Sequence, residues 1–356
     1  MKFLFLPALV QVHVVEQLDI HDILKVSTCS STAEETIKKC RIKIYKAMWD
    51  DGMTWTNEVI YLRRTKKFES HYLHLFFRHS DETHGVPITV NGVTFFIRES
   101  PNHWYFDKKT DNMQNITRYL LSVFEFKIDL AIKWGLKTPS IPWDFTKSLL
   151  DTRRISDLTI FSDYKVTSAS LPTEILIYLL EESTVDTFYC EIDKPDFEYS
   201  NALKIKKLHL PDASWLQMPA LLNSKSSHML IQGFEAKPQD LHLIIKKWLM
   251  KECLENLVTL EIEESIHKAL NPVRTLNCDS KIILDGIQFT TWDQTVDQRT
   301  FRTFKFFRSP EPNSALSGVY EIVRDDGKRA SILLSDDFFG FYVMDKEYME
   351  RHGNLS

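Results

Sequence analysis

Glycine is scarce in this sequence, and its spacing excludes several classes of enzyme. There are 10 glycines among 356 residues, well under half of the usual share of about 7%. The closest two, Gly85 and Gly92, are seven positions apart, so the chain contains no G-x-G pair. It therefore has no dinucleotide-binding fingerprint, no kinase-type phosphate loop and no G-x-S-x-G nucleophile elbow. A G-x-x-x-x-G-K-[ST] loop is also missing, which excludes nucleotide binding by these routes.

Paired cysteines and a basic charge balance are also lacking. The nearest of the five cysteines, Cys29 and Cys40, are eleven positions apart, and no C-x-x-C occurs. An odd, scattered set predicts reduced thiols in a cytoplasmic or nuclear protein and argues against a zinc site. The formal net charge of −5 argues against general nucleic-acid binding. We expect no metal and no cofactor.

Long apolar runs are missing as well. No stretch approaches the ~20 residues of a membrane span, so we expect no membrane partner. The apolar start of the chain, with Lys2 as its single charge, could belong to a signal peptide. It is short and no A-x-A cleavage site follows it. Because the apolar start still resembles a signal peptide in composition, a secreted binding protein or hydrolase stays open as the less favoured alternative.

The first forty residues carry helical patterns. Apolar residues recur in steps of three from Leu6 to Leu18, with Pro7 suited to a first turn. Asp19 or Asp22 can cap a second helix, and a third is expected over 32–42. Three short helices make too small a core to stand alone, so this unit needs a partner or the rest of the chain.

The middle of the chain predicts a hairpin and then a long helix. Two apolar strands over 86–90 and 93–97 flank Asn91-Gly92, a pair suited to a tight turn. Residues 112–134 predict one amphipathic helix that ends at Gly135.

Strands and helices alternate over 156–264. The expected strands are 158–161, 187–192, 205–210, 229–232 and 257–262, and the expected helices are 174–182, 214–223 and 239–253. The strand spacing of about 20 to 30 residues is typical of leucine-rich repeats, which predicts an irregular αβ solenoid. Residues 281–344 then predict antiparallel strands, with turns at Asp285-Gly286 and at 324–327 and a last strand over 338–344. The fold class expected overall is α+β.

Three segments resemble a known family. Leu6-Pro7-Ala8-Leu9-Val10 with the apolar positions up to Ser27-Thr28-Cys29-Ser30 resembles an F-box. The segment from Leu210-Pro211-Asp212 through Trp248 to Leu257, and the run Tyr320–Ile332 with Asp326-Gly327, resemble the type 2 F-box-associated domain of nematode F-box proteins. The Trp248 and Asp326-Gly327 neighbourhoods are the more specific parts. The resemblance implies an F-box over 1–45, a linker region over 46–150, the αβ part of the associated domain over 151–270 and its antiparallel strands over 271–356.

The resemblance further implies a function without chemistry of its own. Such a chain is a substrate receptor that binds a Skp-type adaptor of a cullin–RING ubiquitin ligase through the F-box and selects a protein target with the associated domain. It implies no catalytic residues. The implied adaptor-binding residues are Leu6, Pro7, Leu9, Val12, Val15, Leu18, Ile20, Ile23 and Leu24.

Several alternatives stay open. The same apolar residues could be ordinary core, which periodicity cannot distinguish from adaptor binding. Glu34 and Glu35 stand where F-boxes usually carry basic residues, so an interaction module that works without an adaptor is the second hypothesis. His71, His74, His79 and His84 suit scattered strand and surface positions better than a metal site, and Asp326-Gly327 suits a turn better than catalysis. We expect Trp248 in the core, whereas Trp215 and Trp292 could be surface anchors.

Overall fold

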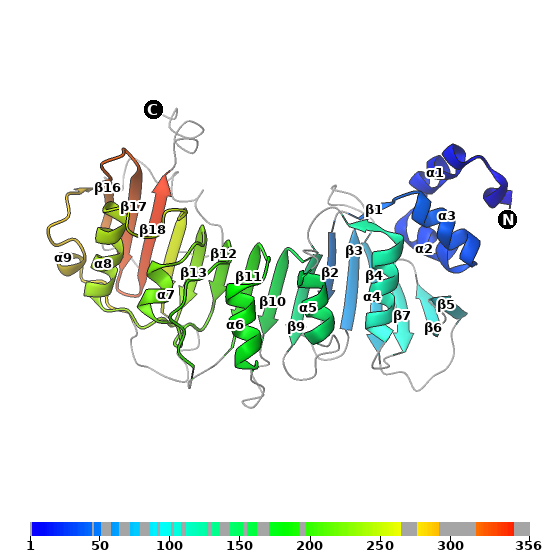
Figure 1. The fold of residues 1–356 in the computed structure, drawn as a ribbon, viewed down its shortest axis with the longest axis horizontal. Coiled ribbons are helices and arrows are strands. Elements are labelled where there is room, and N and C mark those ends of the chain that lie inside the picture. Colours follow the sequence, from blue (N-terminus) through cyan, green and yellow to red (C-terminus); the bar gives the residue numbers. More distant parts are fainter. Residues whose placement is uncertain are drawn as a thin grey trace. The chain divides into compact units, whose positions relative to one another are not determined.

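The chain forms two compact units in the computed structural model, Met1–Ala169 and Ser170–Ser356 (Figure 1). The structure describes residues 2–44, 46–50, 58–63, 72–78, 86–90, 93–100, 103–107, 112–126, 130–135, 143–151, 155–161, 171–192, 197–264, 276–291 and 318–344. Both units combine helices with a sheet, which confirms the mixed α+β class.

The first unit opens with the expected short helices. A 3-10 turn, η1 (Lys2–Phe5), precedes α1 (Ala8–Gln17), α2 (Ile20–Thr28) and α3 (Ser31–Lys39). Asp19 caps α2 by accepting a bond from the Asp22 amide at 2.8 Å, as the sequence predicted. Ser30 caps α3 through the Ala33 amide.

Eight strands of a sheet follow in this unit. Its strand order is β10-β9-β2-β3-β4-β7-β6-β5. The bounds are β2 (Lys46–Asp50), β3 (Glu58–Arg63), β4 (Tyr72–Arg78), β5 (Val86–Val90), β6 (Val93–Ser100), β7 (His103–Asp107), β9 (Leu130–Gly135) and β10 (Asp157–Phe161). The antiparallel β5–β6 pair is the predicted hairpin, with Val90 opposite Val93.

Helices α4 (Asn112–Val123) and α5 (Trp143–Asp151) complete this unit, together with the short parallel pair of β1 (Lys43–Ile44) and β8 (Glu125–Phe126). The indole Nε1 of Trp49 on β2 donates to Thr117 Oγ1 on α4 at 2.6 Å, and both side chains are buried. This hydrogen bond links α4 to strand β2 of the sheet.

The predicted helix over 112–134 is wrong beyond its first twelve residues. Helix α4 ends at Val123, and β8 and β9 follow. The apolar residues from Phe124 to Trp134 fall on every second position as well as on a helical stripe. Alternation is the strand pattern, and β9 lies between β2 and β10, parallel to both. A central position in a sheet favours the extended form over the helix.

Four parallel strands follow one another in the second unit. They are β11 (Thr187–Glu191), β12 (Lys207–Leu210), β13 (His228–Gln232) and β14 (Thr259–Glu263), each beside the next along the chain. Helices α6 (Thr173–Glu181), α7 (Met218–Leu222) and α8 (Pro238–Leu249) alternate with them. The predicted strands and helices of this part are confirmed, although α7 is shorter than expected.

The core of the second unit lies on one face of this sheet. Phe188, Leu208, Met229, Leu260 and Phe341 stand beside one another in register, and all are fully buried. Helix α8 covers this face, since its Trp248 meets the Phe341 ring edge-on at a centroid distance of 5.2 Å.

Antiparallel strands complete the second unit, with one correction. The strands β18 (Phe338–Met344), β17 (Arg329–Ser335), β16 (Gly318–Val323) and β15 (Thr290–Thr291) follow β14 in that order. The strands predicted on the two sides of the Asp285-Gly286 turn are wrong, because Ser280–Ile283 forms the short helix α9 and residues 287–289 are not part of a strand. Asp279 caps α9 through the Lys281 amide. A capping side chain starts a helix even where the apolar run also fits a strand.

No helix within the described ranges is long and apolar enough to cross a membrane.

Candidate functional site

Helix α1 and the two residues Phe5 and Leu6 before it expose large apolar side chains. Phe5 is 89% exposed and Leu9 82% exposed, and Leu6, Val10 and Val14 are also exposed. We call these five residues the α1 surface. Val15 is the only buried residue of α1. Large apolar side chains exposed on consecutive short segments are typical of a protein interaction site.

The predicted adaptor-binding residues divide into three groups by burial. Leu6, Pro7 and Leu9 are exposed, and Val12 and Leu18 are half-buried. Val15, Ile20, Ile23 and Leu24 are buried.

Phe5, Val10 and Val14 belong to the exposed surface but were missed by the sequence reasoning. Steps of three from Leu6 select one narrow stripe of a helix. A helix with solvent on most sides also exposes residues away from that stripe.

Helix α2 is held to α4 by a buried hydrogen bond, and α3 is stabilised by an ion pair within the helix. The Tyr119 hydroxyl on α4 donates to Ser27 Oγ at 2.7 Å, and the Ser27 hydroxyl donates to the carbonyl of Leu24. All three side chains are buried, and burial raises the pKa of Tyr119. On α3, Lys38 pairs with Glu34 at 2.7 Å, and this bond raises the pKa of the lysine. The hydrogen bond between Tyr119 and Ser27 therefore fixes the position of α2, the helix that follows α1, relative to α4.

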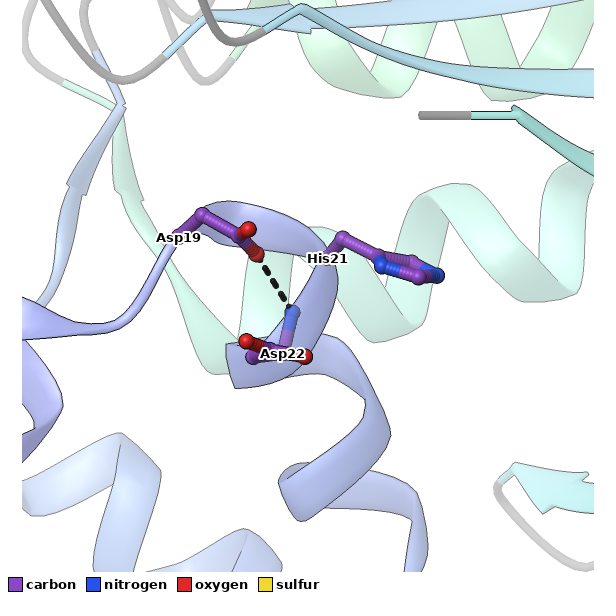
Figure 2. A group of neighbouring side chains, drawn as sticks. All are labelled: Asp19, His21 and Asp22. Atoms are coloured by element: carbon purple, nitrogen blue, oxygen red, sulfur yellow. Dashed lines mark hydrogen bonds between the residues drawn. The ribbon is translucent and has the colours of Figure 1, made fainter. Parts of the chain in front are cut away.

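Asp19, His21 and Asp22 bring three possible metal-ligand atoms within 4.8 Å of one another, the one such group found among the described residues (Figure 2). The Asp19 carboxylate already accepts the Asp22 amide as the cap of α2, and the His21 ring meets the Trp104 ring edge-on at 5.6 Å. Acidic side chains at a helix N-terminus also stabilise the helix dipole. We assign this group a capping role.

The two more specific parts of the family resemblance meet in the second unit. Arg324 Cζ lies 4.8 Å from the centroid of the Trp248 ring, and its Nη1 approaches the Trp248 carbonyl. Asp326 holds the same guanidinium with two bonds of 3.0 and 2.7 Å, and these hold the pKa of that carboxyl far below its usual range. Gly327 follows with φ +83°, as a turn requires. Asp326-Gly327 is thus a turn, as predicted, and its role here is structural.

The sheet face opposite α8 carries buried polar groups. Gln232 Nε2 donates to Glu263 Oε2 at 2.7 Å, and the Tyr342 hydroxyl donates to Glu261 Oε1 at 2.8 Å. Burial raises the pKa of both Glu263 and Tyr342. Burial also lowers the pKa of the neighbouring His209 to about 4. Gln232, Glu261, Glu263 and Tyr342 are buried and His209 is half-buried, so we assign these groups to the structure of the unit.

The remaining predicted candidates are placed as follows. Trp215 and Trp248 are both 1% exposed, so Trp215 is not a surface anchor and Trp248 is core as expected. His74 is half-buried on β4 and meets the Tyr61 ring at 4.8 Å. The other candidates, His71, His79, His84 and Trp292, lie outside the described residues.

Comparisons with models of protein families, with curated proteins and with solved structures find no match for this chain. The chain's own residues and geometry therefore carry the functional argument.

Proposed function

We propose that this chain is the substrate-recognition subunit of a Skp–cullin–F-box ubiquitin ligase. In this proposal, helices α1 to α3 are the F-box and the second unit belongs to an F-box-associated domain that binds a target protein. The chain performs no chemistry itself and acts in the cytoplasm or nucleus. The proposal combines the family resemblance of the sequence with one structural observation.

That observation is the α1 surface. Removing a Leu or Phe side chain from water contributes about 1.5–3 kcal/mol, so several such residues on one helix favour association strongly. Val15, Ile20, Ile23 and Leu24 are buried, so they support the helices from within. The adaptor contact that we propose is therefore narrower than the one the resemblance implied, and it consists of Phe5, Leu6, Leu9, Val10 and Val14.

The second unit suits target binding by its architecture. We interpret its parallel strands β11 to β14, with the intervening helices, as an irregular leucine-rich-repeat-like solenoid closed by β18, β17 and β16. Repeats of this kind present extended surfaces to a partner. The contact between Arg324 and Trp248 supports the assignment to the F-box-associated domain, since it joins the two segments that resemble that domain most specifically.

Co-purification with a Skp-type adaptor tests the proposal. The full-length chain, co-expressed with the adaptor, is expected to retain it through size-exclusion chromatography. Failure to retain it, under conditions in which a known F-box protein succeeds, would contradict the proposal.

A second candidate function is a protein-interaction module that needs no adaptor. The burial of Val15, Ile20, Ile23 and Leu24 favours it, because these four residues already have a structural role within the unit. A folded chain that retains no adaptor but still captures a partner through its second unit would support this candidate.

A further inference from the structure

Two neighbouring chain segments bring lysines together where β12 and β13 begin. The backbone amide of Lys225 donates to the carbonyl of Leu203 at 2.8 Å, and the amide of Ser227 donates to the carbonyl of Lys206 at 2.8 Å. The Ser227 hydroxyl donates to the same Lys206 carbonyl at 3.0 Å. These bonds hold residues 203–206 and 225–227 side by side.

Three of the lysines on these segments point into solvent. Burial alternates along 203–206, with Leu203 and Ile205 fully buried and Lys204 and Lys206 exposed. Lys225 on the neighbouring segment is exposed too. We call Lys204, Lys206 and Lys225 the lysine patch. The alternation of apolar and basic residues at 203–206 is a signal that the sequence already contained.

The lysine patch is not neutralised by the described part of the chain, in which no carboxylate lies within ion-pair distance of these three ammonium groups. An acidic residue lies on the neighbouring backbone, since the carbonyl of Asp186 accepts the Lys207 amide at 2.8 Å. The neighbouring lysines also act on a side chain of the adjacent strand β13. Burial first, and then the charges of Lys207 and Lys206, lower the pKa of His228 to about 4.

We propose that the lysine patch is the docking site for an acidic, Asp- and Glu-rich segment of the target protein. This inference rests on the proposed function, in which the second unit selects the target. Three unneutralised cations on adjacent segments are complementary in charge to a run of carboxylates, which they attract and orient.

The residue types favour carboxylates over phosphates and nucleic acids. All three cations are lysines, which act as compact point charges and lack the planar fork with which arginine grips a phosphate. A chain with a net charge of −5 also repels the extended phosphate backbone of a nucleic acid outside this small patch. A short acidic peptide needs only the local charge.

Fluorescence anisotropy with the full-length protein tests the proposal. The probe is a labelled peptide of alternating Glu and Ser, and the peptide of alternating Gln and Ser is its neutral control. We expect the Glu peptide alone to bind, and its affinity to fall from low to physiological ionic strength because the contact is exposed. The double variant Lys204→Glu/Lys206→Glu is expected to raise the Kd at least about tenfold.

A matched variant separates the patch from net charge. Lys246→Glu/Lys281→Glu makes the same change in charge at exposed positions on α8 and α9, and it is expected to leave the Kd within about twofold. If the Glu variant of the patch misfolds by circular dichroism, Lys204→Gln/Lys206→Gln removes the attraction without adding repulsion, and a smaller loss is expected.

Several results would overturn the proposal. They are no binding of the Glu peptide, an equal loss in both double variants, or tighter binding of a phosphoserine peptide or a single-stranded oligonucleotide than of the Glu peptide. Adaptor retention distinguishes this failure from failure of the proposed function. If the chain retains the adaptor but does not bind the Glu peptide, only the proposal of the lysine patch is contradicted. If the chain binds the Glu peptide but does not retain the adaptor, the proposed adaptor binding is contradicted.

Discussion

The guanidinium of Arg324 lies 4.8 Å above the ring of Trp248, and the two residues are separated by 76 positions in the sequence. Arg324 is 6% exposed and Trp248 is 1% exposed. The Phe341 ring also meets this indole edge-on, at a centroid distance of 5.2 Å. Trp248 therefore joins helix α8 to both the β16–β17 hairpin and β18.

Replacing Trp248 with Ala is expected to lower the free energy of unfolding by about 3–5 kcal/mol, because it empties a buried indole-sized space. Urea unfolding followed by circular dichroism measures this change. Trp248→Phe keeps an aromatic ring beside Phe341, so it should lower the free energy of unfolding markedly less than Trp248→Ala does. Equal stability of the Ala variant and the wild type would contradict the assigned role of Trp248.

Arg324→Lys is expected to lower the melting temperature although the charge is kept. Lysine lacks the planar fork that bonds Asp326 twice and stacks on the indole. Arg329→Lys in the same hairpin is the matched control, because Arg329 is half-exposed and pairs with Glu321 at the surface, where such pairs contribute little. If both variants melt alike, the stacking on Trp248 does not stabilise the fold.

The bond between Tyr119 and Ser27 predicts a measurable coupling between α4 and α2. A double-mutant cycle of Tyr119→Phe and Ser27→Ala is expected to give an interaction free energy of about 1 kcal/mol, typical of a buried hydrogen bond. Thermal or urea unfolding of the four proteins measures it. Strictly additive effects would show that the two hydroxyls do not act together in solution.

We expect the contribution of Glu263 to the free energy of unfolding to depend on pH. Its pKa is raised by burial in the folded chain, so folding favours the protonated form. Its contribution is complete below the ordinary carboxyl pKa and is lost as the pH rises through the raised value. Glu263→Gln cannot ionise and can still accept the bond from Gln232, so the variant should gain stability relative to the wild type as the pH rises from about 4 to about 8.

Urea unfolding at several pH values tests this expectation. Glu255→Gln, at an exposed position, is the matched control and should show no such trend. A stability difference between Glu263→Gln and the wild type that stays constant with pH would contradict the raised pKa.

The sequence predicted β11 to β14 and the helices between them well because the periodicity has one interpretation there. The strands β11 to β14 are short apolar runs between turn residues, and α8 carries a clear stripe that ends in Trp248. The same reasoning failed at Phe124–Trp134, where the apolar residues fit two periods at once. Only the pairing of β9 with strands on both sides decides between them, and such long-range pairing is invisible in a local pattern.

The candidate site could be predicted only in part. The periodicity at Leu6–Leu24 correctly indicated helices, but it does not say which apolar residues other parts of the chain cover. Ile23 is buried and Leu9 is 82% exposed, although both belong to the same apolar pattern. Burial depends on packing with α4 and the sheet, which the local sequence does not specify.

The central claim is that the α1 surface binds a Skp-type adaptor, and the affinity of the full-length chain for that adaptor tests it most directly. Isothermal titration calorimetry compares the wild type with Leu9→Asp and with Thr32→Asp, which adds the same charge at an exposed position on α3. Because Leu9 is already exposed, Leu9→Asp should fold normally by circular dichroism.

The account predicts that the wild type and Thr32→Asp bind alike and that Leu9→Asp binds at least about tenfold more weakly, since a charge would be placed in an apolar interface. No binding by the wild type, or equal binding by Leu9→Asp, would contradict it.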